Sequence, residues 1–304
     1  MGYNDIQSCR NFVGRLDNIY EGIYNMDLTS PRTIRNIQEQ FGFTFKKGLG
    51  QNFLTARNIL EEIVDAAEIE SGVIEVGPGF GVLTSELAQN SDKVVTIEID
   101  ERLIDVLDYT LAEYDNVKII NEDILKLDLK KVIDDEFNGE KVSIAANLPY
   151  YITTPIITKL LEEKLPIKNI VVMVQKEVAE RMSAKPSTKD YGAITVLCQY
   201  YTEPSIVANV PASLFVPPPK VDSAVLKLKV LDKPSVEVKD EGVFFRVVKA
   251  AFSQRRKTLL NCLSANFPIP KDEISTLLES IGIAPSRRGE TLSLEEFANI
   301  ADTL

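Results

Sequence analysis

Residues 73–83 read Val-Ile-Glu-Val-Gly-Pro-Gly-Phe-Gly-Val-Leu, a pattern typical of a strand, a tight turn and the start of a helix. The alternating glycines Gly77, Gly79 and Gly81 lack the Cβ atom that would keep a bound molecule away from the backbone. The N–H groups that open the following helix can then face a ligand. A dinucleotide-binding turn would carry its third glycine one residue later, where this chain has Val82. The segment therefore predicts either a ligand-binding turn of another class or a structural corner between strand and helix.

The next predicted strand gives a second reason to expect a ligand. Residues 93–99 read Lys-Val-Val-Thr-Ile-Glu-Ile, and Glu98 falls near the end of this strand. Nucleotide-binding α/β folds place a carboxylate at about this distance from the glycine turn, where it binds ribose hydroxyls. The alternative is that Glu98 and Asp100 cap a helix that begins near Glu101. Both interpretations can hold together, with Glu98 on the ligand and Asp100 on the helix.

Predicted strands and helices alternate in the first part of the chain, which specifies a mainly parallel sheet covered by helices on both faces. Two later segments, 206–210 and 221–230, are predicted to form an antiparallel pair at the end of the sheet. We therefore expect an α/β protein with a seven-stranded, Rossmann-like sheet. The other five strands are predicted at residues 73–76, 94–99, 117–120, 142–146 and 170–174.

Helix and linker signals divide the chain into parts. Ser30-Pro31 predicts a helix start, and Thr55 is predicted to cap a helix that runs to about Ile69. Lys233-Pro234 marks a linker, and the residues from 243 onward carry only helical patterns. We expect an N-terminal extension over residues 1–25, either poorly ordered or due to an early start site, an α/β domain over 26–232, and a small all-α domain over 233–304.

Composition narrows the possible chemistry. The chain has no histidine, which removes imidazole-based nucleophilic triads and most zinc hydrolase sites. Its three cysteines, Cys9, Cys198 and Cys262, form no Cys-x-x-Cys pair, so we expect reduced thiols and no metal site. No apolar run has membrane-spanning length and no secretion signal is recognisable, so a cytoplasmic protein without membrane contact is expected.

Charge alone argues against a nucleic-acid partner, because the formal net charge is −11. The distribution of charged residues along the chain is more informative than the net charge. Residues 246–257 read Arg-Val-Val-Lys-Ala-Ala-Phe-Ser-Gln-Arg-Arg-Lys and contain five cations and no acid. As a helix, this segment would place Arg246, Lys249, Arg256 and Lys257 on one side. The segment predicts either an RNA-binding face or merely a solvated one.

Polar residues follow four of the predicted parallel strands, at the sheet edge where α/β folds bind ligands. After Gly77 and Glu98, the third strand runs into Asp123, which can accept a hydrogen bond from an exocyclic amine or serve as a turn aspartate. The fourth strand ends in Asn147-Leu148-Pro149-Tyr150. The asparagine amide offers a donor and an acceptor to a base edge, and the tyrosine ring offers a surface for stacking. An ordinary turn is the alternative for this tetrapeptide.

Several long motifs follow one another along the chain: Gly50-Gln-Asn-Phe-Leu54, Glu75-Val-Gly-Pro-Gly79, Ile97-Glu-Ile-Asp100, Asn147-Leu-Pro-Tyr-Tyr-Ile-Thr-Thr-Pro155, Gln175-Lys-Glu-Val178, Phe215-Val-Pro-Pro-Pro-Lys-Val-Asp-Ser-Ala224, Phe252-Ser-Gln-Arg-Arg-Lys-Thr-Leu259 and Arg287-Arg-Gly-Glu290. In this order, the motifs resemble those of the ribosomal RNA adenine N6,N6-dimethyltransferases that modify the 3′ end of small-subunit RNA. The resemblance covers residues from about Met26 to the C-terminus and excludes residues 1–25.

The resemblance implies S-adenosyl-L-methionine as the cofactor and residues 26–232 as the methyltransferase domain. Asn52 and Leu54 would hold the methionine end of the cofactor, and Asn147 would lie between cofactor and target. Gly77, Gly79, Glu98 and Asp123 would bind the rest of the cofactor, with Glu98 on the ribose and Asp123 on the adenine amine. Asn147 and the Leu148 carbonyl are expected to accept the N6 hydrogens, and Tyr150 to stack on the target base. Phe215 is either a second stacking residue or a core aromatic.

The implied partner is small-subunit ribosomal RNA within an assembling 30S particle, bound by a monomer. RNA contacts are expected at Lys46, Lys47, the 185–189 loop and the basic residues Arg255, Arg256 and Lys257. The alternatives are a large-subunit methyltransferase, a ribosome-assembly factor without catalysis, and a nicotinamide dehydrogenase. Thr154-Pro155 and the C-terminal match favour the small-subunit enzyme, the complete cofactor set argues against lost catalysis, and Val82 disfavours the dehydrogenase.

Overall fold

A computed structural model describes residues 26–43 and 52–304 of the chain. The predicted extension over residues 1–25 and the predicted RNA contacts Lys46 and Lys47 lie outside the described residues. So do Gly50 and Gln51, the first two residues of the first motif.

The predicted seven-stranded, mainly parallel sheet is confirmed. Its first five strands in spatial order are parallel, and the last two are antiparallel to their neighbours, as expected for the terminal pair. In spatial order the strands are β4 (Val117–Asn121), β3 (Val94–Glu98), β2 (Val73–Val76), β5 (Val142–Asn147), β6 (Ile167–Gln175), β9 (Ser223–Val230) and β7 (Thr202–Val210).

Helices cover both faces of the sheet because successive side chains of each central strand enter different cores. In β2, Ile74 and Val76 belong to one buried cluster and Val73 to the other. The first cluster includes residues of α6 (Leu129–Phe137), α7 (Thr153–Glu162), α8 (Lys176–Met182) and α9 (Ala193–Tyr201). The second includes residues of α2 (Pro31–Phe41), α3 (Arg57–Ala67), α4 (Val82–Gln89), the 3-10 turn η2 (Glu101–Leu103) and α5 (Ile104–Thr110).

The N-terminal helices begin and end close to the predicted positions. α2 starts at Pro31 after Ser30, and Gly42 ends it in the left-handed conformation, with φ of 59°. The predicted cap of α3 is wrong. Thr55 does not cap this helix, whose N-cap position is Ala56, because the Thr55 hydroxyl instead donates a hydrogen bond to the carbonyl of Leu214.

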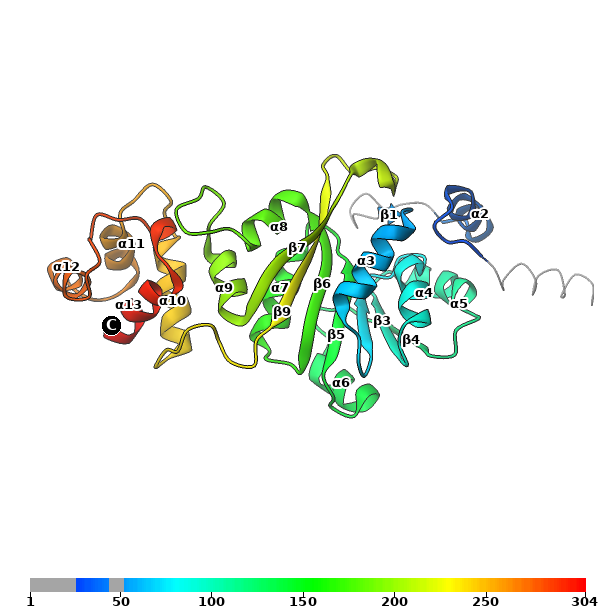
Figure 1. Cartoon of the computed structure of the whole chain (residues 1–304), viewed down its shortest axis with the longest axis horizontal. Helices are drawn as coiled ribbons and strands as arrows, with labels where there is room; N and C mark the ends of the chain where they lie inside the picture. Colours follow the sequence, from blue (N-terminus) through cyan, green and yellow to red (C-terminus); the bar gives the residue numbers. More distant parts are fainter. Residues whose placement is uncertain (1–25, 44–51) are drawn as a thin grey trace, which may run out of the picture.

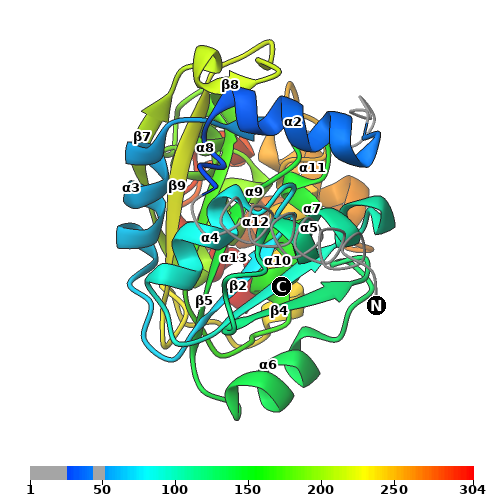
Figure 2. The ribbon, with the colours of Figure 1, turned by 90° about the vertical axis from the view of Figure 1, so that its right-hand side faces the viewer.

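The C-terminal helices gather at one end of the molecule, and α2, α4 and α5 lie at the other (Figure 1). Figure 2, viewed from that second end, shows α2 in front of the sheet. The C-terminal helices are α10 (Glu241–Ala251), α11 (Leu259–Asn266), α12 (Lys271–Ser280) and α13 (Leu294–Thr303), with the 3-10 turn η4 (Gly289–Thr291) before α13.

The predicted continuous basic helix over residues 246–257 is wrong in its second half. α10 ends at Ala251, and Arg255, Arg256 and Lys257 lie in the turn before α11. The side-chain oxygen of Thr258 caps α11 by accepting from the Asn261 N–H, so a new helix starts here with its own capped end.

The helical C-terminal part packs on the sheet domain through aromatic rings. Tyr200, from α9, stacks on Phe244 of α10 with ring centroids 4.8 Å apart. Glu241, at the start of α10, accepts a hydrogen bond from the Tyr201 hydroxyl and pairs with Lys164. A shared buried cluster therefore joins α9 to the C-terminal helices. The predicted boundary between residues 232 and 233 precedes α10, and the division into two domains stays a prediction.

Candidate active site

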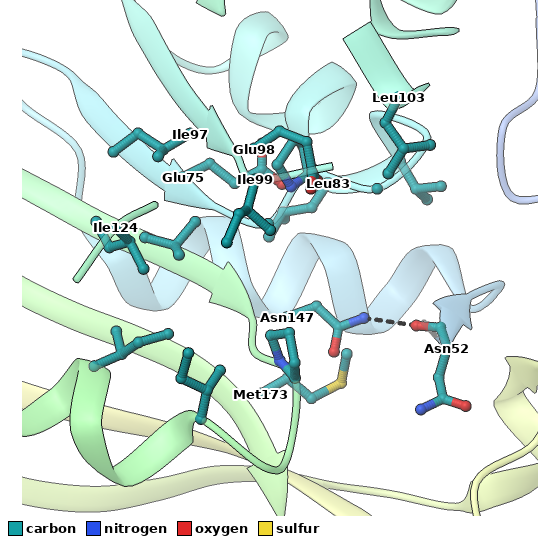
Figure 3. A pocket seen from close by; sticks show the side chains of 18 of the residues that line it. Asn52, Glu75, Leu83, Ile97, Glu98, Ile99, Leu103, Ile124, Asn147 and Met173 are labelled. Carbon is teal, nitrogen blue, oxygen red and sulfur yellow. Dashed lines mark hydrogen bonds between the residues drawn. The ribbon is translucent and has the colours of Figure 1, made fainter. Parts of the chain in front are cut away.

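A pocket lies at the carboxyl ends of β2, β3, β4 and β5, where the sequence predicts a ligand (Figure 3). Its volume, including the open mouth, is about 1040 Å³. The pocket is lined by all seven residues predicted to bind a cofactor, whose individual roles stay predictions: Asn52, Leu54, Gly77, Gly79, Glu98, Asp123 and Asn147.

The glycine turn forms one wall of the pocket and needs glycine for two reasons. Gly77, Gly79 and Gly81 have φ of 71°, 61° and 82°, a left-handed conformation that other residues rarely adopt. A Cβ atom on Gly79 would lie 2.7 Å from the ring of Phe53. A Cβ atom on Gly77 would meet only the Pro149 ring at 4.0 Å, so this backbone is open to a ligand.

Glu98 and Asp100 differ in what their side chains contact. Glu98 is 5% exposed, lines the pocket and accepts a 2.8 Å hydrogen bond from the Asp100 N–H at its Oε1 atom. Burial raises the pKa of Glu98 to about 7. Asp100 caps the following 3-10 turn and pairs with the Arg102 guanidinium. The helix-start interpretation therefore holds for Asp100, and Glu98 remains available to a ligand.

Glu75 is a pocket residue whose role was not predicted from the sequence. It is 1% exposed in the middle of β2, and the Thr84 hydroxyl donates a 2.5 Å hydrogen bond to its Oε2 atom. Burial raises its pKa to about 8. The signal that could have revealed this residue is an acidic side chain inside an otherwise apolar strand.

The two buried glutamates predict how stability depends on pH. The pKa values of about 8 for Glu75 and about 7 for Glu98 lie above the ordinary value of 4.5. Between about pH 5 and about pH 8 the folded protein therefore binds more protons than the unfolded chain, so the free energy of unfolding falls as the pH rises. We expect the urea midpoint to fall across this range, and Glu75→Gln to reduce the fall.

Urea titrations followed by circular dichroism at several pH values measure this pH dependence of stability, with exposed Glu101→Gln as the control. An unchanged pH dependence in Glu75→Gln would contradict the assignment.

Asp123 serves the turn after β4 and also faces the pocket. Its Oδ1 atom accepts a 3.0 Å hydrogen bond from the Leu125 N–H, and its Oδ2 atom lies 3.8 Å from the Lys126 ammonium. The turn interpretation is therefore correct for one carboxylate oxygen. Because a carboxylate accepts several hydrogen bonds, the residue keeps capacity for a ligand amine.

The segment from Asn147 to Tyr150 is held at three points. The Asn147 Nδ2 atom donates a 2.9 Å hydrogen bond to the Asn52 carbonyl, as Figure 3 shows. The Leu148 N–H donates to the Met173 carbonyl at 3.1 Å, and the Leu148 side chain is buried. The Tyr150 hydroxyl lies 2.6 Å from the Ser223 hydroxyl. These contacts fix the end of β5 against three other parts of the chain.

Three aromatic residues near the pocket, Phe215, Tyr150 and Tyr151, differ in burial and in whether they line it. Phe215 is 2% exposed in the core and pairs with Leu54, so its burial favours the core interpretation over base stacking. Tyr150 is half-buried and does not line the pocket, and its predicted stacking role stays a prediction. Tyr151, which the sequence analysis gave no role, lines the pocket and is 58% exposed.

Two of the predicted RNA-contact segments are joined by a hydrogen bond. The Arg255 guanidinium donates a 2.8 Å hydrogen bond to the Lys189 carbonyl and lies 3.8 Å from the Glu290 carboxylate. This contact joins the 185–189 loop to the turn that carries Arg255, Arg256 and Lys257, all of which are exposed. The structure thus places two of the predicted basic segments next to each other.

Within residues 26–43 and 52–304, no group of three or more His, Cys, Asp or Glu side chains is arranged to hold a metal ion. In the same ranges, no helix is both long and apolar enough to cross a membrane.

Comparison with known proteins finds a matching family model and relatives that are similar over most of their length. A family model described as ribosomal RNA adenine dimethylase matches residues 42–304. Ribosomal RNA small subunit methyltransferase A from Bacillus mycoides is 55% identical over 284 residues, which cover 91% of this chain and 97% of the relative. The protein of the same name from Bacillus cereus gives the same values.

Two solved structures share the fold and most of the chain. A dimethyladenosine transferase from Plasmodium falciparum superposes with a TM-score of 0.69 at 30% identity, covering 82% of this chain and 95% of that one. The 23S rRNA methyltransferase ErmE gives a TM-score of 0.63 at 27% identity, covering 83% and 99%.

Proposed function

This chain belongs to the ribosomal RNA adenine dimethylase family, and from that premise we propose that it transfers methyl groups from S-adenosyl-L-methionine to N6 of two adjacent adenosines near the 3′ end of small-subunit ribosomal RNA. The observation that carries this proposal is the 55% identity to small-subunit methyltransferases over nearly their whole length. Identity to the large-subunit enzyme ErmE is 27%, which disfavours the large-subunit alternative. The activity is thus adenine dimethylation of small-subunit RNA, in ribosome biogenesis.

The pocket residues fit a nucleoside cofactor of the S-adenosylmethionine type. The turn at Gly77 leaves backbone open toward the pocket, and Glu98 presents a buried carboxylate that suits ribose hydroxyls. Asp123 suits the adenine amine, and Asn52 and Leu54 suit the methionine end. When bound, the cofactor supplies an electrophilic methyl group on a sulfonium sulfur.

The end of β5 is proposed to bind the target amine. The Asn52 carbonyl can only accept hydrogen bonds, so the atom of the Asn147 amide that faces it is the NH₂ group. The Asn147 Oδ1 atom is then the acceptor for one N6 hydrogen, and the Leu148 carbonyl is proposed to accept the other. Two such acceptors draw electron density toward N6 and orient its lone pair toward the methyl carbon.

The proposed mechanism relies on positioning and electrostatics, and it needs no strong base. The target base must leave its stack to reach the pocket, and Tyr150 is proposed to stack on it. The Ser223 hydroxyl lies 2.6 Å from the Tyr150 hydroxyl, and this contact fixes the outer end of the ring. The chain has no histidine, in keeping with a reaction that needs no imidazole.

The proposed substrate is the RNA within an assembling 30S particle in the cytoplasm, and the enzyme is proposed to act as a monomer. A direct test incubates the purified protein with labelled S-adenosyl-L-methionine and, in separate reactions, small-subunit particles, naked small-subunit RNA or naked large-subunit RNA. Mapping the label should show two adjacent dimethyladenosines near the 3′ end. Label only in large-subunit RNA would contradict the substrate, and binding without label would favour an assembly factor that lacks catalysis.

Reversal of the exposed cations Arg255, Arg256 and Lys257 to glutamate should weaken RNA binding by about tenfold or more, because phosphate contacts provide most of the affinity. Affinity for the cofactor should not change. Filter binding at several salt concentrations measures the first effect, and the salt dependence should also decrease.

Two further variants separate charge from structure in this experiment. Arg255 also holds the Lys189 carbonyl, so reversal of Arg256 and Lys257 alone tests charge without breaking that contact. Reversal of Lys130 and Lys131 on α6 gives the same change of charge outside the proposed RNA surface. Equal RNA affinity of the wild type and the Arg256/Lys257 variant would remove the proposed role.

A further inference from the structure

Two short segments from distant parts of the chain form a separate two-stranded ribbon beside the pocket. β1 (Phe53–Leu54) pairs antiparallel with β8 (Phe215–Val216), with Phe53 opposite Val216 and Leu54 opposite Phe215. Thr55 extends the pairing, because both its N–H and its hydroxyl donate 2.9 Å hydrogen bonds to the Leu214 carbonyl. Thr55 itself does not line the pocket.

The ring of Phe53 sets the ribbon against the glycine turn. It stacks on Phe80 with ring centroids 4.3 Å apart and an interplanar angle of 21°. It also fills the space over Gly79, where an added Cβ would lie 2.7 Å from the ring. Phe53 is 5% exposed, so the ring has little freedom to move. β1 is therefore held on two sides, by its pairing with β8 and Leu214 and by the contact of Phe53 with the glycine turn.

The residue just before the ribbon contacts the proposed catalytic amide. The Asn52 carbonyl accepts the hydrogen bond from Asn147 Nδ2, and this contact decides which end of the amide carries the acceptor. A rotated amide would point its NH₂ group at the target amine, which also presents hydrogens. The position of one backbone carbonyl therefore selects the productive orientation of Asn147.

We infer that the β1–β8 ribbon positions the Asn147 amide for methyl transfer, and that Thr55 is a positioning residue of this reaction although it lies outside the pocket. The inference rests on the proposed function. Thr55 holds the end of β1 to Leu214 beside β8, Asn52 directly precedes β1 in the chain, and the Asn52 carbonyl accepts the hydrogen bond of the Asn147 amide.

The test compares Thr55→Val, which removes the hydroxyl at nearly constant volume, with Thr55→Ser, which keeps it. We expect Thr55→Val to slow single-turnover methyl transfer at saturating RNA and cofactor by about three- to tenfold, the effect of losing one hydrogen bond. Thr55→Ser should stay close to the wild-type rate, and the cofactor dissociation constant should be unchanged in both. Thr55→Ala should behave like Thr55→Val and replaces it if the valine variant does not fold.

Two controls separate positioning from general destabilisation. Thr202→Val removes a similar buried bond, from the Thr202 hydroxyl to the Cys198 carbonyl, and should leave the rate unchanged. In an Asn147→Ala background, Thr55→Val should cause no further loss, because its effect acts through that amide. A wild-type rate in Thr55→Val, or an equal loss in both backgrounds, overturns the inference. Absence of methyl transfer by the wild type would instead refute the proposed function.

Discussion

Asn147→Ala is expected to slow methyl transfer at saturating RNA and cofactor by about 100- to 1000-fold while the protein still folds. The substitution removes the Oδ1 atom proposed to accept an N6 hydrogen, an interaction that gains strength as positive charge develops on the nitrogen. It also removes the hydrogen bond to the Asn52 carbonyl. Because the core residues on β5 are unchanged, the sheet should form as in the wild type.

Single-turnover incorporation of labelled methyl groups measures this effect, and calorimetric titration with the cofactor shows that the pocket is intact. Asn116→Ala is a matched control. Its Nδ2 atom donates to the carbonyls of Ala88 and Ser91, beside the start of β4 and thus at the opposite ends of the strands. It should lower stability and leave the rate unchanged. Turnover by Asn147→Ala within about threefold of the wild type would refute the role assigned to the amide.

Glu98→Gln is expected to weaken cofactor binding by about 10- to 100-fold, because hydrogen bonds from the ribose hydroxyls to a charged acceptor are replaced by weaker ones. The chemical step at saturating cofactor should change much less. Glu101→Gln, at an exposed position three residues later, is the matched control. Isothermal titration calorimetry gives both dissociation constants, and equal affinities would exclude Glu98 from the ribose site.

The same carboxyl predicts the pH dependence of cofactor binding. Burial raises the pKa of Glu98 to about 7, so much of it is protonated at slightly acidic pH. Ribose hydroxyls bind best to the ionised form, so affinity should rise between about pH 6 and about pH 8. Glu98→Gln should flatten this rise. Because Glu75 also titrates in the upper part of this range, only the part of the rise that Glu98→Gln removes is assigned to Glu98.

Local sequence patterns predicted the sheet well because they depend on neighbouring residues. The strand predicted at residues 73–76 matches β2 residue for residue, and the glycines that follow it take the left-handed conformation that glycine favours. Gly42 ends α2 for the same local reason. The ends of four strands also predicted where the pocket lies, since parallel topology brings those ends to one edge.

Two helix predictions failed, one because of a distant hydrogen-bond partner and one because of a local cap. Thr55 was predicted as a helix cap, but its hydroxyl donates to a carbonyl 159 residues away. The basic segment was predicted as one helix, but α10 ends at Ala251 and Thr258 caps a new one. Periodicity alone does not show this boundary, because it follows only the spacing of apolar residues and not the cap that Thr258 forms with the Asn261 N–H, three residues away.

By itself, the sequence determined the alternation of strands and helices, the backbone conformation of the glycine turn, and the presence of an amide and a phenol after the fourth strand. Only the tertiary structure decided that Asn52 faces Asn147, that Phe215 is in the core, and that burial raises the pKa values of Glu75 and Glu98. Conformational preferences act over a few residues and can be predicted from the sequence. Hydrogen-bond partners and desolvation depend on segments that meet only after the chain has folded.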